Sequence, residues 1–87
     1  MRARDIVAWN LRSIRTGRGL SQEALADESG VNRSFVSDIE RATVSVSVDI
    51  LDRMAGALGV DLVTLVTPPA VGSSPPQPLT SGRKPRG

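Results

Sequence analysis

The sequence contains no cysteine and no histidine. Without cysteine, the chain can form neither a disulfide bond nor a thiolate metal site, and without histidine it lacks the commonest general base and metal ligand. No apolar run approaches the length that spans a membrane, and the N-terminal segment lacks the apolar centre of a signal peptide. We therefore expect a cytoplasmic protein that carries no metal ion or other cofactor and binds no membrane.

The same absences argue against an enzyme. A chain of 87 residues suffices for one domain but not for a large core with a deep substrate cleft. Carboxylate pairs such as Asp27 and Glu28 are present, but no histidine, metal-ligand cluster or glycine-rich phosphate loop accompanies them. These carboxylates are therefore interpreted as ordinary helix-surface residues, and no catalytic site is expected.

The net charge of +2 is unevenly distributed along the chain. Residues 1–18 carry five arginines against one aspartate, a net charge of +4, whereas residues 19–66 carry three arginines against eight carboxylates, a net charge of −5. Arg83, Lys84 and Arg86 supply another +3 near the C-terminus. Binding to nucleic acid would therefore depend on a local basic surface and not on the field of the whole protein.

Apolar residues at helical spacing predict helices over about residues 5–15, 48–58 and 62–66. The side chains expected to face the core from these helices are Val7, Leu11, Ile14, Leu51, Met54, Ala55, Leu58, Leu62 and Leu65. Trp9 lies off the first stripe and is expected to close the core against the C-terminal region. Ser47 is a suitable cap for the helix over 48–58, and Asp61 for the last helix.

The sequence of residues 22–41 predicts two short helices joined by a tight turn. Ser21 can cap the first helix because its hydroxyl accepts from a free amide of the first turn, and Gly30 can end it because glycine tolerates the left-handed conformation. Asn32 can cap the second helix, residues 33–41. The residues expected to face the core are Leu25, Ala26, Val31, Val36 and Ile39. The polar N-terminal half of the second helix is then left exposed.

This stretch resembles the helix-turn-helix of the lambda-repressor/Cro (XRE) family of bacterial and phage regulators. The resemblance runs from about Val7 to Leu65 and includes the flanking phrases Gly19-Leu20-Ser21-Gln22 and Ile39-Glu40-Arg41. Residues 32–41 are most similar to the controller proteins of restriction–modification systems. The resemblance implies an all-α, five-helix DNA-binding domain over residues 1–66, with its helix-turn-helix at 22–41, in a sequence-specific transcriptional regulator.

In such proteins the second helix enters the major groove of double-stranded DNA with its N-terminal residues toward the bases. Arg33 can then donate to guanine O6 and N7, while Ser34 and Ser37 can reach bases or phosphates. Asp38 either accepts from cytosine N4 or repels the backbone in wrong registers. Phe35 either packs on the core or contacts a thymine methyl or a sugar edge.

The resemblance also assigns roles outside the base contacts. Gln22 and Asn32 are placed to bind phosphates, and Arg41 completes the expected DNA-binding set. Arg15 and Glu40 correspond to a pair that forms a salt bridge in many relatives, although Arg15 is alternatively placed to face a phosphate.

A homodimer is expected, because one recognition helix makes too few contacts for tight, selective binding. Ile50, Val63 and Val66 are apolar residues that the core stripes do not use, so they are the expected dimer surface. Two recognition helices about 34 Å apart would read a pseudo-palindromic operator.

Two features support a different function, that of an antitoxin or anti-activator that acts through protein contacts. The first is the negative charge of residues 19–66. The second is the loop at 42–46, which lacks the lysines that many relatives aim at phosphates. The same loop has Ala42 where relatives usually have glycine, and because alanine resists a positive φ, the resemblance does not fix the path of the loop. Residues 67–87 contain all six prolines and little to bury, so they are predicted to form a disordered tail with a basic end.

Overall fold

The computed structural model of the chain describes residues 1–70. This part contains five α-helices and no strand: α1 (Ala3–Gly17), α2 (Gln22–Ser29), α3 (Arg33–Glu40), α4 (Val48–Leu58) and α5 (Leu62–Val66). The prediction of an all-α, five-helix domain is therefore confirmed. None of these helices within residues 1–70 has the length and apolar character that a membrane crossing requires. Most of the predicted disordered tail, residues 71–87, lies outside the described residues.

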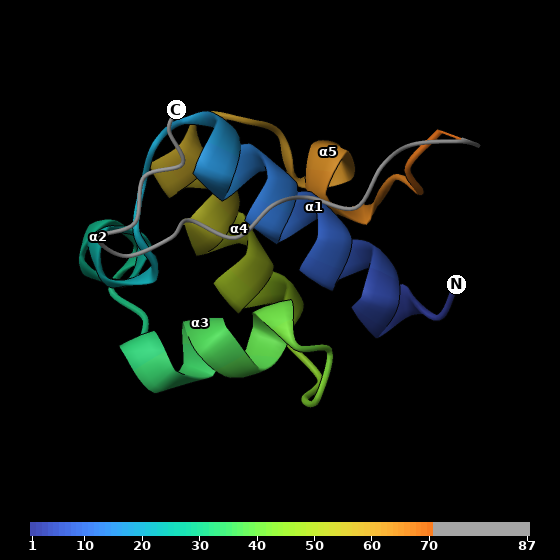
Figure 1. Cartoon of the computed structure of the whole chain (residues 1–87), viewed down its shortest axis with the longest axis horizontal. Helices are drawn as coiled ribbons and strands as arrows, with labels where there is room; N and C mark the ends of the chain where they lie inside the picture. Colours follow the sequence, from blue (N-terminus) through green and yellow to red (C-terminus); the bar gives the residue numbers. More distant parts are fainter. Residues whose placement is uncertain (71–87) are drawn as a thin grey trace, which may run out of the picture.

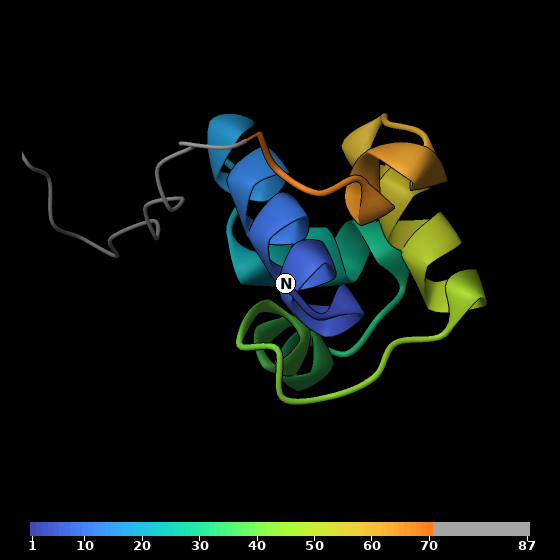
Figure 2. The ribbon, with the colours of Figure 1, turned by 90° about the vertical axis from the view of Figure 1, so that its right-hand side faces the viewer.

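The helices wrap around one core (Figure 1). Helix α1 packs against α3 and α5, and α2 packs against α3 and α4. Figure 2 shows α1 nearly end-on, with α4 and α5 on one side of it and α3 below. As a result α3 lies along one edge of the molecule, on the opposite side from α5.

Every helix contributes at least one fully buried apolar side chain to the core. Leu11, Leu25, Val36, Met54 and Leu65, one from each helix in order, are all 0% exposed. Burying a side chain of this size stabilises the fold by about 1.5–3 kcal/mol. The core positions predicted from helical spacing are therefore the positions that hold the five helices together.

Three of the four N-cap side chains expected from the sequence form the capping hydrogen bond. The side-chain oxygens of Ser21, Asn32 and Ser47 accept from backbone amides of the following turn at 3.0, 2.8 and 3.1 Å. Gly30 takes the left-handed conformation after α2, with φ of 72°. The expected cap at Asp61 is wrong, because its side chain makes no capping hydrogen bond to α5.

The first helix is longer at both ends than the sequence predicted. At its start, Asp5 accepts hydrogen bonds from the backbone amide and the Nε of Arg2, at 3.2 and 3.1 Å. The hydrogen bond from Arg2 is also the main reason why the pKa of Asp5 lies below its ordinary value. This pairing satisfies a free amide at the helix start, which allows α1 to begin at Ala3.

Asn10 attaches the end of the described chain to α1. Its Nδ2 donates to the carbonyl oxygens of Leu65 at 2.9 Å and Thr67 at 2.7 Å. The sequence predicted Trp9 in this position, but Trp9 is half-buried in the wall of a hollow that it shares with Arg41, at the end of α3. The amide, not the indole, therefore joins α1 to the C-terminal region.

Candidate nucleic-acid interface

The exposed side of α3 is polar, and the opposite side is anchored in the core. Val36 and Ile39 are almost completely buried, whereas Asn32, Arg33 and Ser34 are exposed. Arg33 forms no salt bridge with any residue in the described part of the chain. The N-terminal half of α3 therefore presents a guanidinium and a hydroxyl to solvent.

The oxygen and the nitrogen of the Asn32 side-chain amide have different roles. Its Oδ1 accepts from the backbone amide of Ser34 at 2.8 Å, which caps α3. The two N–H groups of the same amide have no partner among the described residues and remain available as donors. A cap that also presents donors at a helix N-terminus is suited to bind an anion such as a phosphate.

Phe35 lies at the margin between the core and the exposed face. It is half-buried and packs against the buried core cluster. Phe35 comes directly after the exposed Ser34 in α3, and part of its side chain remains accessible to solvent. Core packing and an exposed aromatic edge are therefore combined in one residue.

The C-terminal half of the same face contains an ion pair. Asp38 accepts from Arg41 through a short side-chain contact, and both side chains remain accessible to solvent. Ser37, one turn from Arg41, is half-exposed. Because Arg41 offsets its charge, the carboxylate of Asp38 does not stand as an isolated negative charge on this surface.

A buried network fixes α3 relative to α1 and α2. Arg15 donates from Nε to Glu40 Oε2 at 2.6 Å and from Nη2 to Oε1 at 2.8 Å, and its Nη1 donates to the Leu20 carbonyl at 2.8 Å. The two charged side chains are only 4% and 3% exposed. This burial rules out the alternative placement of Arg15 against a phosphate and makes it a positioning residue for α3.

Gln22 belongs to this network as well. Its Nε2 donates to Glu40 Oε1 at 3.1 Å, so the first residue of α2 is tied to the last residue of α3. No local pattern indicates this contact, because Gln22 and Glu40 lie 18 residues apart on different helices. The network orients the Gln22 amide at the N-terminus of α2 and leaves its second N–H group without a partner among residues 1–70.

Sequence reasoning also missed a contact at the N-terminal end of α1. Arg4 Nη2 donates to Ser45 Oγ, in the loop after α3, at 3.2 Å. The two residues are 41 positions apart, and neither lies in a recognisable motif. Only the packing of α1 against α3 brings them together.

Two hollows of about 330 and 360 Å³ flank α1, one toward α4 and α5 and one toward the end of α3. Within residues 1–70, no group of three histidine, cysteine, aspartate or glutamate side chains could hold a metal ion. The exposed face of α3 is therefore the candidate site.

Comparison with known proteins places this geometry in context. A family model described as helix-turn-helix (HTH_3) matches residues 11–65. The chain is 39% identical over 66 residues to a hypothetical transcription factor of Neisseria meningitidis, covering 76% of this chain and 62% of that protein. It is 40% identical over 68 residues to the control protein C.BamHI of Bacillus amyloliquefaciens, covering 74% of this chain and 84% of that protein.

Solved structures agree with these matches. The crystal structure of the Neisseria transcription factor superimposes with a TM-score of 0.76 at 38% identity, covering 78% of each chain. The restriction–modification controller protein C.AhdI of Aeromonas hydrophila superimposes with a TM-score of 0.70 at 39% identity, covering 71% of this chain and 94% of that one.

Proposed function

Since the chain belongs to the HTH_3 helix-turn-helix family of DNA-binding transcriptional regulators, we propose that α3 is its recognition helix and reads one half of an operator. The observation that carries this assignment is the exposed guanidinium of Arg33, which has no ion-pair partner within residues 1–70 and lies in the first turn of a helix whose other side is buried. Recognition helices approach base edges with their N-terminal residues. Arg33 donates to guanine O6 and N7, a contact worth about 1–3 kcal/mol of discrimination.

The remaining residues of the face assist this contact. Ser34 and Ser37 donate to bases or phosphates, and Phe35 offers its exposed edge to a thymine methyl or a sugar. Asp38 orients Arg41, which then donates its other N–H groups to the backbone. Such phosphate contacts set the position of the protein on DNA, whereas base contacts select the sequence.

Gln22 and Asn32 bind phosphates at the N-termini of α2 and α3. Each side chain already holds one hydrogen bond within the protein, to Glu40 and to the Ser34 amide. These bonds orient the remaining donors before DNA arrives, which lowers the ordering cost of binding. The buried pair of Arg15 and Glu40 then fixes the angle between the two helices.

We further propose that the protein acts as a homodimer through α4 and α5. Val63 and Val66 are 67% and 43% exposed, so α5 carries apolar side chains that the core does not bury. Ile50 is partly used by the core, so its share of the dimer surface is smaller than the sequence suggested. Two copies related by a two-fold axis would place their α3 helices about 34 Å apart, which suits a pseudo-palindromic operator.

Selection of duplexes from a random-sequence pool tests the regulator assignment. The wild-type protein is expected to enrich a pseudo-palindromic motif, and Arg33→Ala is expected to lose the preference for one base pair in each half-site. Glu28→Ala, a change at an exposed residue of α2 outside the face, serves as the matched control. Failure of the wild-type protein to enrich any motif would refute the assignment.

The same selection experiment, combined with purification of the wild-type protein, distinguishes a regulator from an antitoxin or anti-activator. The net charge of −5 on residues 19–66 favours this alternative, because it weakens attraction to DNA. Co-purification of the wild-type protein with one stoichiometric partner, together with the absence of motif enrichment, would support it. Enrichment without such a partner would support the regulator.

A further inference from the structure

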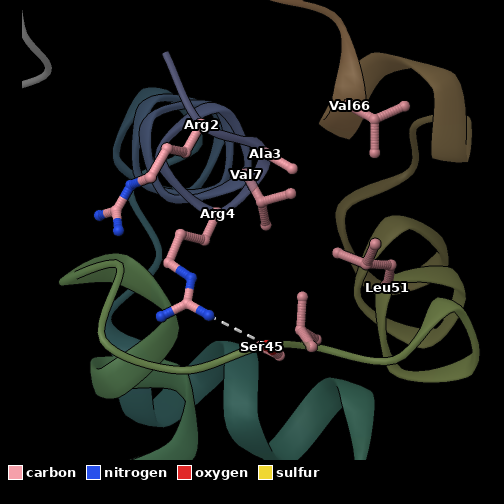
Figure 3. Close-up of a pocket in the computed structure, with 8 residues that line it drawn as sticks. Arg2, Ala3, Arg4, Val7, Ser45, Leu51 and Val66 are labelled. Carbon is pink, nitrogen blue, oxygen red and sulfur yellow. Dashed lines mark hydrogen bonds between the residues drawn. The ribbon is translucent and has the colours of Figure 1, made fainter.

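Arg4 reaches across from α1 to the loop that follows α3. Figure 3 shows its side chain extending from the first turn of α1 toward Ser45, beside a hollow lined by Val7, Leu51 and Val66. Its Nη2 donates to Ser45 Oγ at 3.2 Å. This hydrogen bond holds the guanidinium at the loop.

The pair presents mainly hydrogen-bond donors to solvent. A serine oxygen that accepts from arginine still has its own O–H to donate, and a guanidinium has five N–H donors, of which this contact uses one. The remaining donors are fixed in a planar fork that matches two oxygens of a phosphate. The arrangement therefore has the chemistry of an anion site.

The loop lies where a phosphate strand is expected. Figure 1 shows the segment after α3 continuing along the same edge of the molecule as α3. A helix in the major groove has a sugar-phosphate backbone on each side, so the chain that leaves the helix meets one of them. Ser45 is exposed in this segment.

Arg4 brings a positive charge to the loop after α3, at Ser45. The loop at 42–46 contains no charged residue, and Arg41 just before it is paired with Asp38. Two other arginines of α1 and its cap are also paired, Arg2 with Asp5 and Arg15 with Glu40. Arg4 forms no salt bridge within residues 1–70, which leaves its charge available to a ligand.

We propose that Arg4 and Ser45 form a phosphate-binding pair that extends the DNA footprint from α3 to the first turn of α1, and this rests on the proposed function. The pair supplies the cation that the loop itself lacks. Because it contacts the backbone only, it strengthens binding to every sequence and adds no base preference.

The salt dependence of binding tests the pair. Dissociation constants of the wild-type protein, Arg4→Gln and Ser45→Ala are measured across a range of salt concentrations, on the duplex selected by the wild-type protein and on an unrelated duplex. Arg4→Gln is expected to weaken binding to both duplexes by the same factor. It should also reduce the slope of log affinity against log salt by about 0.9 for each phosphate that a protomer no longer neutralises. Ser45→Ala should weaken both by a smaller factor.

Arg18→Gln is the matched control, because Arg18 is the exposed C-cap of α1. Figure 1 shows that this end of α1 lies away from α3. The slope of Arg18→Gln should equal that of the wild-type protein. An unchanged slope in Arg4→Gln, or a weakening confined to the selected duplex, would overturn the pair while leaving the regulator assignment intact. If the wild-type protein selects no duplex at all, the regulator assignment and the pair both fail.

Discussion

Arg15 and Glu40 form a two-pronged ion pair in the interior of the domain, 25 residues apart, and join the middle of α1 to the end of α3. Their charges are removed from water, so the Coulombic attraction must offset a large desolvation cost. All three nitrogens of the guanidinium have an acceptor, two on Glu40 and one on the Leu20 carbonyl. The pair therefore holds α3 at a fixed position relative to α1.

Breaking this pair from one side should be costly. Glu40→Ala leaves the Arg15 guanidinium buried without a counter-charge, and we expect the free energy of unfolding to fall by about 3–5 kcal/mol. Removing both charges with Arg15→Met and Glu40→Leu should cost less than the single change, because no unpaired charge remains. Urea unfolding followed by circular dichroism measures both values. A decrease below about 1 kcal/mol in Glu40→Ala would mean that the pair behaves as an exposed one.

Substitutions at Asn32 should separate its role as the cap of α3 from its proposed contact with DNA. Asn32→Ala removes the acceptor for the Ser34 amide, and we expect a decrease of about 1 kcal/mol in stability. Asn32→Asp keeps the acceptor, so stability should stay near that of the wild-type protein. Its carboxylate replaces two donors with a negative charge, so DNA affinity at low salt should fall by about tenfold or more. Wild-type affinity in Asn32→Asp would remove Asn32 from the phosphate contacts.

Ala42 stores backbone strain just after α3. It is the one non-glycine residue with a positive φ in residues 1–70, at 59°. The left-handed conformation costs an L-residue about 1–2 kcal/mol, and the extra chain entropy of glycine offsets about 0.5–1 kcal/mol of the relief. We therefore expect Ala42→Gly to raise the free energy of unfolding by about 0.5–1 kcal/mol.

Ala57→Gly provides the contrast, because Ala57 lies within helix α4. It should lower stability by about 1 kcal/mol, since glycine is less favourable than alanine in a helix and the methyl group of Ala57 packs against the core. Thermal unfolding of the two variants side by side makes the comparison. A destabilised Ala42→Gly would show that the conformation of the loop is not strained in solution.

Local signals made most of the fold predictable. Helical spacing identified Leu25 and Met54 as core residues, and the hydroxyl of Ser21 and the freedom of Gly30 marked both ends of α2. Each of these signals acts within one or two helical turns. The chain therefore specifies its helices with residues that are close together in sequence.

Contacts between distant elements could not be read in the same way. Nothing local pairs Arg4 with Ser45, or Gln22 with Glu40, because these contacts exist only after α1, α2 and α3 have packed. The pairing of Arg15 with Glu40 was implied by family resemblance and not by spacing. Asp38 and Arg41 are a different case, since their separation of three residues suits a pair on one helix face.

The proposed dimer surface can be tested without disturbing α3. Val63 is exposed on α5, and Val63→Lys would place an ammonium group in an apolar contact between two copies. Burial of an unpaired charge is expensive, so we expect self-association to weaken by at least about tenfold in sedimentation equilibrium. Binding to a single half-site should stay unchanged, while binding to the full operator should fall.

Thr64→Lys is the control for this change, because Thr64 is the next exposed residue of α5 and already polar. It adds the same positive charge to the same helix, so any general effect of charge on DNA affinity should appear in both variants. Only Val63→Lys should shift the monomer–dimer equilibrium if α5 forms the interface. Equal shifts of the monomer–dimer equilibrium in the two variants would show that α5 is not the interface. A wild-type protein that sediments as a monomer at micromolar concentration would refute the dimer itself. In the monomeric case, full-operator affinity would have to come from one α3 helix and its phosphate contacts alone, which is too small a surface for tight and selective binding.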